Sequence, residues 1–155
     1  MNLLYTSISG NTRSFVSRMQ KFAEKTHEEN PNAPIIHIKE IHDNTLEEEE
    51  TSPFFVIVPT YLEGGNGIDN GDQEILTENL RDYIAYEDNA EYCLGVVGSG
   101  NKNFNHQYCL TAKQYARQFK VPFLADFELR GSSREIEKIY QTLWQKWEKA
   151  GNKLD

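Results

Sequence analysis

The sequence predicts a three-layer α/β sandwich, in which helices cover both faces of a five-stranded parallel sheet. Short apolar runs typical of strands alternate with segments whose apolar residues recur every three or four positions, as on one face of a helix. The run PFFVIVP at 53–59 is almost continuously apolar, which suits a strand buried on both faces of a parallel sheet. Strands that alternate with helices need right-handed crossovers, so the class is doubly wound α/β. We expect the 155 residues to form one domain.

The first expected strand covers residues 2–6, and a helix follows over 12–26. A break rich in proline and asparagine separates this helix from a second strand over 35–39, which is rich in isoleucine. The link over 40–52 has room for only a short helix. Its four consecutive glutamates at 47–50 favour a solvated surface turn.

The third strand, over 53–59, is expected at the centre of the sheet because it is the most apolar. A long segment rich in glycine and asparagine follows over 61–72, and a loop of this length is uncommon unless it is functional. Apolar residues at helical spacing over 76–84 then predict a helix. The run YCLGVV at 92–97 predicts the fourth strand.

A polar turn, GSGNKNFN at 98–105, separates the fourth strand from a helix whose apolar face spans 108–119. The fifth strand is expected over 121–129. The last helix carries apolar residues at helical spacing over 136–150, and Gly151 is its expected C-cap.

Three polar loops are predicted to meet at one edge of the sheet. Residues 6–12, 60–72 and 98–105 each follow a strand. Ligands of open α/β sheets bind beyond the carboxyl ends of the strands, where the strand order reverses. The sequence therefore predicts a ligand site built from these three loops.

The first loop, TSISGNT at 6–12, has the composition of a phosphate cradle. Small hydroxyl side chains and the free N–H groups of the following helix can donate to an anion, and Gly10 lets the backbone turn close to it. The loop lacks the lysine of a triphosphate-binding loop and the spaced glycines of a dinucleotide site, so a terminal monophosphate fits better. The alternative is that Ser9 or Asn11 only caps the helix.

The other two loops suit a flat ring. Tyr61 offers an aromatic face, while Gly64 and Gly65 can bring backbone groups close to a ring edge. The loop at 98–105 combines glycines with amide side chains and Phe104. A phosphate cradle beside two ring-binding loops makes flavin mononucleotide (FMN) the obvious candidate ligand.

Several segments resemble known families. SISGNT at 7–12 resembles the phosphate loop of flavodoxins, Ser/Thr-x-Thr-Gly-Asn-Thr. GSGNKNFN at 98–105, followed by Tyr108 and Cys109, resembles the Gly-x-Gly-Asn-Arg/Lys-Asn-Phe signature of the NrdI family, and FELRG at 127–131 is similar to the end of its members. The resemblance covers essentially the whole chain and implies a flavodoxin-like fold with strand order 2-1-3-4-5.

This resemblance implies a specific redox function. NrdI proteins are flavodoxin-like partners of class Ib ribonucleotide reductase, and their reduced FMN reacts with O2 to give a superoxide-level oxidant. The oxidant passes to the dimanganese site of the radical-bearing subunit and permits formation of its tyrosyl radical. The implied protein is thus an oxidant generator rather than a classical substrate-turnover enzyme, with no catalytic side chain because the chemistry is on the flavin. Its implied partners are that subunit, an electron donor that reduces the flavin, and O2.

The resemblance also implies cofactor contacts. The first loop would hold the phosphate, the second would lie against the isoalloxazine ring, and the third would cover the opposite edge. The implied FMN-binding residues are Ser7, Ile8, Ser9, Gly10, Asn11, Thr12, Thr60, Tyr61, Leu62, Glu63, Gly64, Gly65, Gly98, Ser99, Gly100, Asn101, Asn103, Phe104, Tyr108 and Cys109. The second loop is longer than in many NrdI proteins, through Gly67 to Asp72, which leaves open which glycine contacts flavin N5.

Composition argues against several other classes. A formal charge of −8 without a basic patch disfavours nucleic acid and anionic membranes as partners. No apolar run approaches the roughly 20 residues of a membrane-spanning helix, and no leader is visible, so we expect a cytoplasmic protein. Cys93 and Cys109 form no Cys-x-x-Cys pair, which agrees with a reducing compartment, and Cys109 is expected to pack rather than to react. The four histidines lack metal-ligand spacing, so no metal site is expected.

Two alternative functions stay open. A general flavodoxin that carries electrons between enzymes would share the phosphate cradle, and the segment GNKNF at 100–104 favours NrdI over it. A non-redox phosphate-site protein would need a cysteine nucleophile in the first loop, or paired aspartates after the first and third strands. The sequence has neither.

Overall fold

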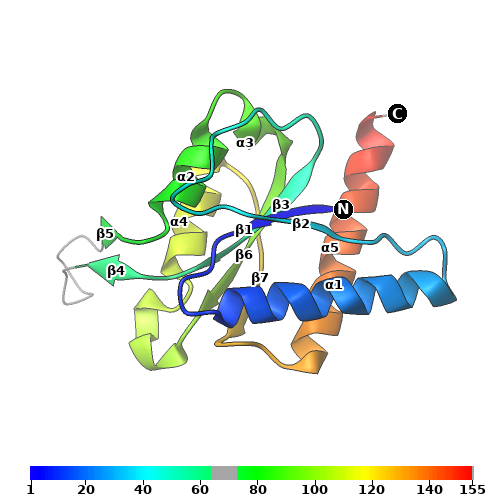
Figure 1. Ribbon diagram of the computed structural model, residues 1–155, viewed down its shortest axis with the longest axis horizontal. Coiled ribbons are helices and arrows are strands. Elements are labelled where there is room, and N and C mark those ends of the chain that lie inside the picture. The colour runs from blue at the N-terminus through cyan, green and yellow to red at the C-terminus, as the bar shows by residue number, and fades with distance from the viewer. Residues whose placement is uncertain (64–72, 155) are drawn as a thin grey trace.

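The computed structural model describes residues 1–63 and 73–154. Its main sheet has five parallel strands in the order β2-β1-β3-β6-β7, with β3 at the centre (Figure 1). The strands are β1 (Asn2–Tyr5), β2 (His37–Glu40), β3 (Phe54–Pro59), β6 (Cys93–Gly100) and β7 (Phe123–Glu128). The predicted α/β class and the order 2-1-3-4-5, counted over these five strands, are confirmed.

The central strand β3 is buried along its whole length. Phe55 and Ile57 belong to the hydrophobic core on one face of the sheet, while Phe54, Val56 and Val58 belong to the core on the other face. This division explains why the sequence of β3 is almost continuously apolar: both faces of the strand are covered, so no position alternates to solvent.

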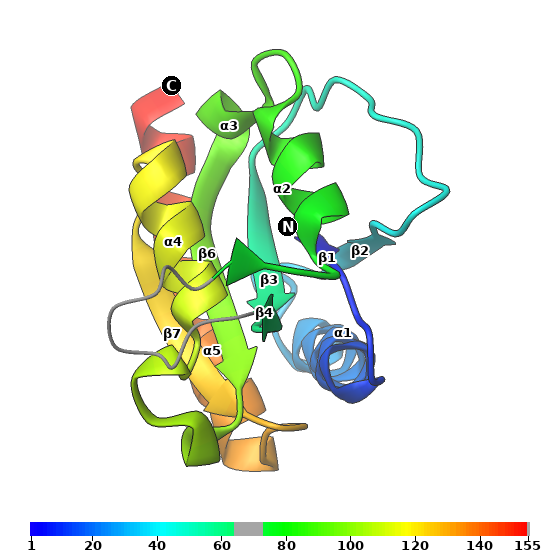
Figure 2. The ribbon, with the colours of Figure 1, turned by 90° about the vertical axis from the view of Figure 1, so that its left-hand side faces the viewer.

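Helices cover both faces of the sheet. α1 (Asn11–Glu29) and α5 (Ser133–Leu154) lie on one face, and α2 (Glu78–Ala85), the short α3 (Asn89–Tyr92) and α4 (Leu110–Phe119) lie on the other (Figures 1 and 2). The apolar stripe of each long helix points to the sheet, which gives the predicted three layers. Within the described ranges, no helix is both long enough and apolar enough to cross a membrane.

The predicted end of the fourth strand is wrong. β6 continues through Gly98 and Ser99, which pair with both β3 and β7, to Gly100, which pairs with β7. This parallel pairing holds the glycines in an extended conformation that their own propensity does not favour. The third loop therefore begins at Asn101.

Three predicted helix boundaries are also wrong. Leu76 and Tyr108 precede α2 and α4 instead of belonging to them, and Leu76 has a φ of 68°, outside the right-handed helical region. At the other end of the chain, α5 continues through Gly151 to Leu154. An exposed glycine inside a helix costs only about 1 kcal/mol, which does not by itself end the helix.

The long second loop starts and ends in a small antiparallel sheet. β4 (Leu62–Glu63) pairs with β5 (Gln73–Glu74), and the Ile75 N–H donates to the Tyr61 carbonyl at 3.0 Å. The chain therefore leaves β3 and enters α2 through this two-stranded hairpin base (Figure 2).

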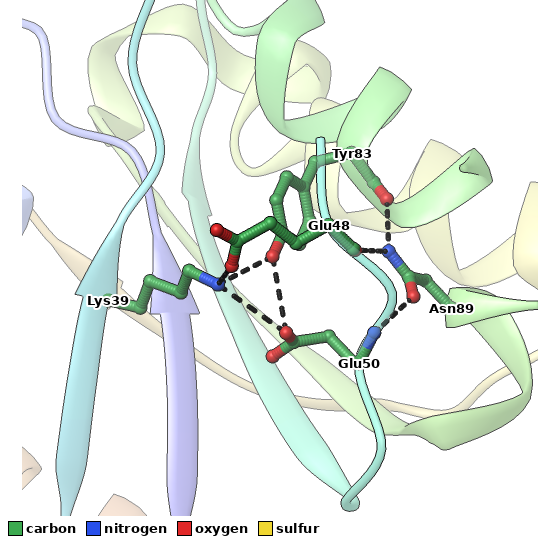
Figure 3. A network of polar contacts seen from close by, with 5 residues as sticks. All are labelled: Lys39, Glu48, Glu50, Tyr83 and Asn89. Atoms are coloured by element: carbon green, nitrogen blue, oxygen red, sulfur yellow. Dashed lines mark hydrogen bonds and ion pairs between the residues drawn. The ribbon is translucent and has the colours of Figure 1, made fainter. Parts of the chain in front are cut away.

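Residues 41–52, all of them described, form no helix, and a polar network fastens this connection to the fold (Figure 3). Lys39 Nζ lies 3.0 Å from Glu48 Oε2 and 3.4 Å from Glu50 Oε2, and it donates to the Tyr83 hydroxyl at 2.6 Å. The buried Asn89 side chain accepts the Glu50 N–H at 2.7 Å and donates to the Glu48 carbonyl at 2.9 Å. The connection is thereby tied to β2, α2 and α3.

The expectation of a solvated turn holds for the first three glutamates of 47–50, which are exposed, and is wrong for Glu50. Only 16% of the Glu50 side chain is exposed. Burial raises the pKa of Tyr83, so its hydroxyl stays protonated and donates to Glu50 Oε2 at 3.2 Å. The carboxylate is accommodated because a cation and a hydroxyl both face it.

Gly98 provides a test of the packing behind β6. A Cβ at this position would lie 2.8 Å from Ala112 Cβ and 2.9 Å from Cys109 Cβ, so α4 would have to move away from the sheet. We expect Gly98→Ala to lower the free energy of unfolding by about 1–3 kcal/mol, measured by urea denaturation.

Gly151→Ala is the matched control, because a Cβ there meets no atom within 4 Å and lies inside α5. Its unfolding free energy should rise by up to about 1 kcal/mol. If Gly98→Ala has the same free energy of unfolding as the wild type, α4 does not pack tightly against β6 at this position.

Candidate functional site

A cavity of about 330 Å³ lies at the carboxyl edge of the main sheet, where the sequence predicts the ligand site. Strands β1, β3, β6 and β7 all end at this edge. Among the described residues, those lining the cavity are Ser9, Asn11, Thr12, Pro59, Thr60, Tyr61, Ser99, Gly100, Asn101, Gln107 and Leu129. Eight of these eleven are residues that the sequence predicts.

The first loop wraps the start of α1. Gly10 is the N-cap residue with a φ of 96°, a left-handed conformation that glycine adopts without strain. The Arg13 N–H donates to Ser7 Oγ at 3.2 Å, so Ser7, rather than Ser9 or Asn11, satisfies one free N–H of the first turn. Ser9 and Asn11 line the cavity instead, which argues against a mere capping role for them. Ser7, Ile8 and Gly10 shape the loop without lining the cavity.

Thr12 and Ser99 join the first loop to β6. Both side chains are buried, and their hydroxyl oxygens lie 3.3 Å apart although the residues are 87 positions apart in sequence. Because each hydroxyl can rotate, either can donate to the other or to a ligand oxygen. This pair places a hydroxyl group of the first loop beside a hydroxyl group of β6.

The second loop reaches the first through Tyr61. The Tyr61 hydroxyl donates to Ser9 Oγ at 3.0 Å, and the Thr60 Oγ1 accepts the Thr111 N–H of α4 at 3.2 Å. The backbone of Leu62 and Glu63 continues into β4. The predicted contacts Gly64 and Gly65 lie outside the described residues, as does the extension over 67–72.

A buried carboxylate anchors the far end of the second loop. The Glu74 side chain is 5% exposed and accepts hydrogen bonds from the Tyr115 hydroxyl at 2.6 Å, from Arg81 Nη1 at 3.0 Å and from Thr77 Oγ1. Burial and Glu74 together raise the pKa of Tyr115, which keeps this hydroxyl a donor. The hairpin base is thereby fixed to α2 and α4.

The third loop forms a 3-10 helix, η1 (Lys102–Gln107), directly after β6. Asn101 lines the cavity, and its Oδ1 accepts the Asn103 N–H at 2.9 Å, which fixes the turn into η1. Asn103 and Phe104 lie in η1. The Tyr108 hydroxyl donates to Asp126 Oδ1 at 2.9 Å, and Tyr108 does not line the cavity.

Gly98 and Cys109 face each other behind the cavity rather than in it. Cys109 is buried and is the N-cap residue of α4. It therefore precedes the helix, whereas the predicted helix over 108–119 would include it in the first turn. A Cβ on Gly98 would lie 2.9 Å from Cys109 Cβ, and one on Gly100 would lie 3.0 Å from the Cys109 nitrogen. The described contacts give these predicted site residues a packing function.

Sequence reasoning missed three lining residues, Pro59, Gln107 and Leu129. Leu129 could have been found, because it follows the fifth strand and the same topological argument applies to that strand end. Pro59 is the last residue of β3 and Gln107 the last of η1, and the sequence holds no signal for either.

Comparisons with known proteins agree with this geometry. A family model described as NrdI flavodoxin-like matches residues 3–141. An NrdI-like protein of Streptococcus pyogenes serotype M18 is 55% identical over 144 residues, which cover 92% of this chain and 91% of the relative. Protein NrdI of Mesoplasma florum is 31% identical over 147 residues, covering 94% and 84%. The solved structure of oxidised flavodoxin 2 from Bacillus cereus is similar in fold, with a TM-score of 0.60 over 96% of this chain and 97% of that one at 16% identity.

The thiols provide a test of the packing function of Cys109. Burial raises the pKa of Cys93 and of Cys109 to about 12, because the charged thiolate is disfavoured away from water. Near pH 8 only about one thiol in ten thousand would be ionised. We expect the native protein to resist a thiol reagent such as DTNB, and the protein unfolded in guanidinium chloride to release two thiols per chain. A fast native reaction that is lost in Cys109→Ser would instead place this thiol at the cavity.

Proposed function

Because this chain belongs to the NrdI flavodoxin-like family, we propose that it binds FMN in the cavity at the carboxyl edge of the sheet. In this proposal the protein with reduced FMN generates a superoxide-level oxidant from O2. The oxidant serves to assemble the dimanganese–tyrosyl radical cofactor of the radical-bearing subunit of a class Ib ribonucleotide reductase. The whole chain, 1–155, acts as one FMN-binding domain.

The observation that carries the proposal is that three strand-end loops line one cavity, with the first loop bonded to the second and to β6. Tyr61 bonds Ser9 across the first two loops, and Thr12 meets Ser99 between the first loop and β6. A ligand with a phosphate at one end and a flat ring at the other needs such an arrangement. A cavity of about 330 Å³ is also within the size range of cofactor sites.

The residues present fit the two ends of FMN. Ser9, Asn11 and Thr12 offer hydroxyl and amide groups beside the N-terminal end of α1, where free N–H groups and the helix dipole favour an anion. Tyr61 and Asn101, which also line the cavity, offer an aromatic face and an amide for the ring.

The protein's part is to hold and shield the cofactor. When bound, FMN supplies the electron transfer to O2. Thr12 and Ser99 fix the phosphate end against β6, Tyr61 orients the ring side, and Leu129 adds an apolar side chain to the lining. No protein side chain needs to be a catalytic group in this scheme.

A general electron-carrying flavodoxin is the second candidate, because the fold similarity to flavodoxins supports it too. The segment GNKNF at 100–104, which forms the end of β6 and the start of η1, favours the NrdI function. A non-redox phosphate-site protein is disfavoured, since the residues that follow β1 and β3 are Thr6 and Thr60 rather than aspartates.

The proposal includes a cytoplasmic location and a separate electron donor that reduces the flavin. Cys93 and Cys109 are both free, which agrees with a reducing compartment. The net charge of −8 disfavours nucleic acid and anionic membranes as partners.

FMN binding is tested with the purified apoprotein. We expect it to take up one FMN per chain, to turn yellow and to quench the flavin fluorescence. Riboflavin should bind at least about tenfold more weakly, because it lacks the charged group that the 7–12 loop receives. A colourless protein that ignores FMN in a titration would rule out both flavin functions.

Radical generation separates the two flavin functions. The reduced holoprotein, mixed with O2 and a manganese-loaded class Ib radical subunit, should produce a tyrosyl radical detectable by electron paramagnetic resonance. An unrelated flavodoxin at the same concentration is the control. If the control works equally well, or if this protein gives no radical, the NrdI function is wrong while the FMN site stands.

A further inference from the structure

We propose that Arg130 binds the phosphate of the flavin beside the 7–12 loop, and that Arg18 is the positioning residue that holds it there. The inference rests on the proposed function and assigns a cation to a cradle whose predicted donors are all neutral. Arg130 Nε donates to Asn11 Oδ1 at 3.3 Å, and Asn11 lines the cavity. The bond brings a guanidinium from the end of the chain's fifth main strand to the first loop.

The contact also orients Asn11. Because its Oδ1 accepts from Arg130, its Nδ2 group is left to donate. An amide that donates, next to a guanidinium that donates, suits an anionic ligand and not a cation. Arg130 therefore contributes a charge and also leaves the Nδ2 group of Asn11 to face the ligand.

Arg18 holds the backbone of Arg130 against α1. Arg18 Nη1 donates to the Gly131 carbonyl at 3.1 Å, its Nη2 donates to the Arg130 carbonyl, and its Nε donates to the Ser14 carbonyl at 3.2 Å. One side chain of α1 thus binds two consecutive carbonyls of the turn after β7. Gly131 lets that turn approach, because its φ is 72° and a Cβ there would lie 2.6 Å from Phe15 Cδ2.

Among the described residues, no carboxylate neutralises the charge of Arg130. Arg13, on the same loop–helix junction, forms an ion pair with Glu40 at 2.7 Å. In the described part of the chain no carboxylate pairs with Arg130, and its one hydrogen bond uses one of five N–H donors. Arg130 is exposed beside Asn11, so its remaining N–H donors are open to an anionic ligand at this place.

A phosphate monoester is the anion that this arrangement fits best. The planar fork of a guanidinium matches two phosphate oxygens, and hydrogen bonds between charged partners are about twice as strong as neutral ones. The N-terminal end of α1 and the hydroxyls of the first loop supply the remaining donors. Arg130 thus adds the charged contact that distinguishes FMN from riboflavin.

The test compares flavin affinities by fluorescence quenching. Arg130→Gln should weaken FMN binding about 10- to 100-fold and leave riboflavin binding unchanged, because only FMN carries the phosphate. Arg134→Gln removes the same charge from a position that is also exposed, in the first turn of α5, and should change FMN binding less than about twofold. Arg130→Lys, which keeps the charge without the fork, should be intermediate.

Two further measurements separate a phosphate contact from a general structural effect. The ratio of the Arg130→Gln and wild-type dissociation constants should shrink as the pH falls below about 6, where the phosphate takes up its second proton. Arg18→Gln should also weaken FMN and spare riboflavin. The double variant should bind FMN no more weakly than Arg130→Gln alone, because both act through one contact.

The outcomes distinguish this inference from the proposed function. Unchanged FMN affinity in Arg130→Gln, or equal weakening of FMN and riboflavin, overturns the phosphate contact. The proposed FMN site still stands in that case, provided that the wild-type protein binds FMN. If the inhibition constant of inorganic phosphate against FMN is the same in wild type and Arg130→Gln, the contact is likewise overturned. A wild-type protein that does not bind FMN overturns the proposed function together with the inference.

Discussion

The site depends on the parallel pairing of β1 and β6 with the buried strand β3. The register places Tyr5 beside Ile57 and Pro59 beside Ser99, so the chain leaves neighbouring strands at nearly the same level. Loops that are distant in sequence therefore begin next to one another before any loop side chain makes a contact. The hydrogen bonds between Tyr61 and Ser9, and between Thr12 and Ser99, are possible because the sheet brings the ends of these strands together.

Local pattern predicted the elements well where an element's own residues encode its burial. The helical spacing of α1 and the continuous apolar run of β3 each reflect burial that the element's own residues encode. The end of β6 could not be read this way, because its glycines are extended only through pairing with two other strands. Glu50 and Glu74 escaped prediction for a related reason: the partners that make their burial tolerable, Tyr83 and Tyr115, lie 33 and 41 positions away.

In the candidate site too, features encoded locally could be predicted and features that depend on distant segments could not. The hydroxyl-rich loop at 6–12 could be recognised from composition, since the chemistry of a phosphate cradle is local. Leu129 and Arg130 could not be recognised by composition, because their relevance comes from the end of β7 lying beside α1. Topology alone would have drawn attention to that strand end, but only the contacts of Arg18 and Arg130 show that the turn is held against α1 and bonded to Asn11.

Glycine positions around the site have two physical meanings that sequence alone does not separate. Gly10 has a left-handed backbone and open space around it, so its role is conformational. Gly98 and Gly100 have their free space filled by Cys109 and its neighbours, so their role is to let α4 approach β6. The wall of the cavity that carries Ser99 is thus positioned from behind, by apolar packing against a helix. It follows that flavin affinity should respond to the fit between α4 and β6 even where no substituted atom touches the cofactor.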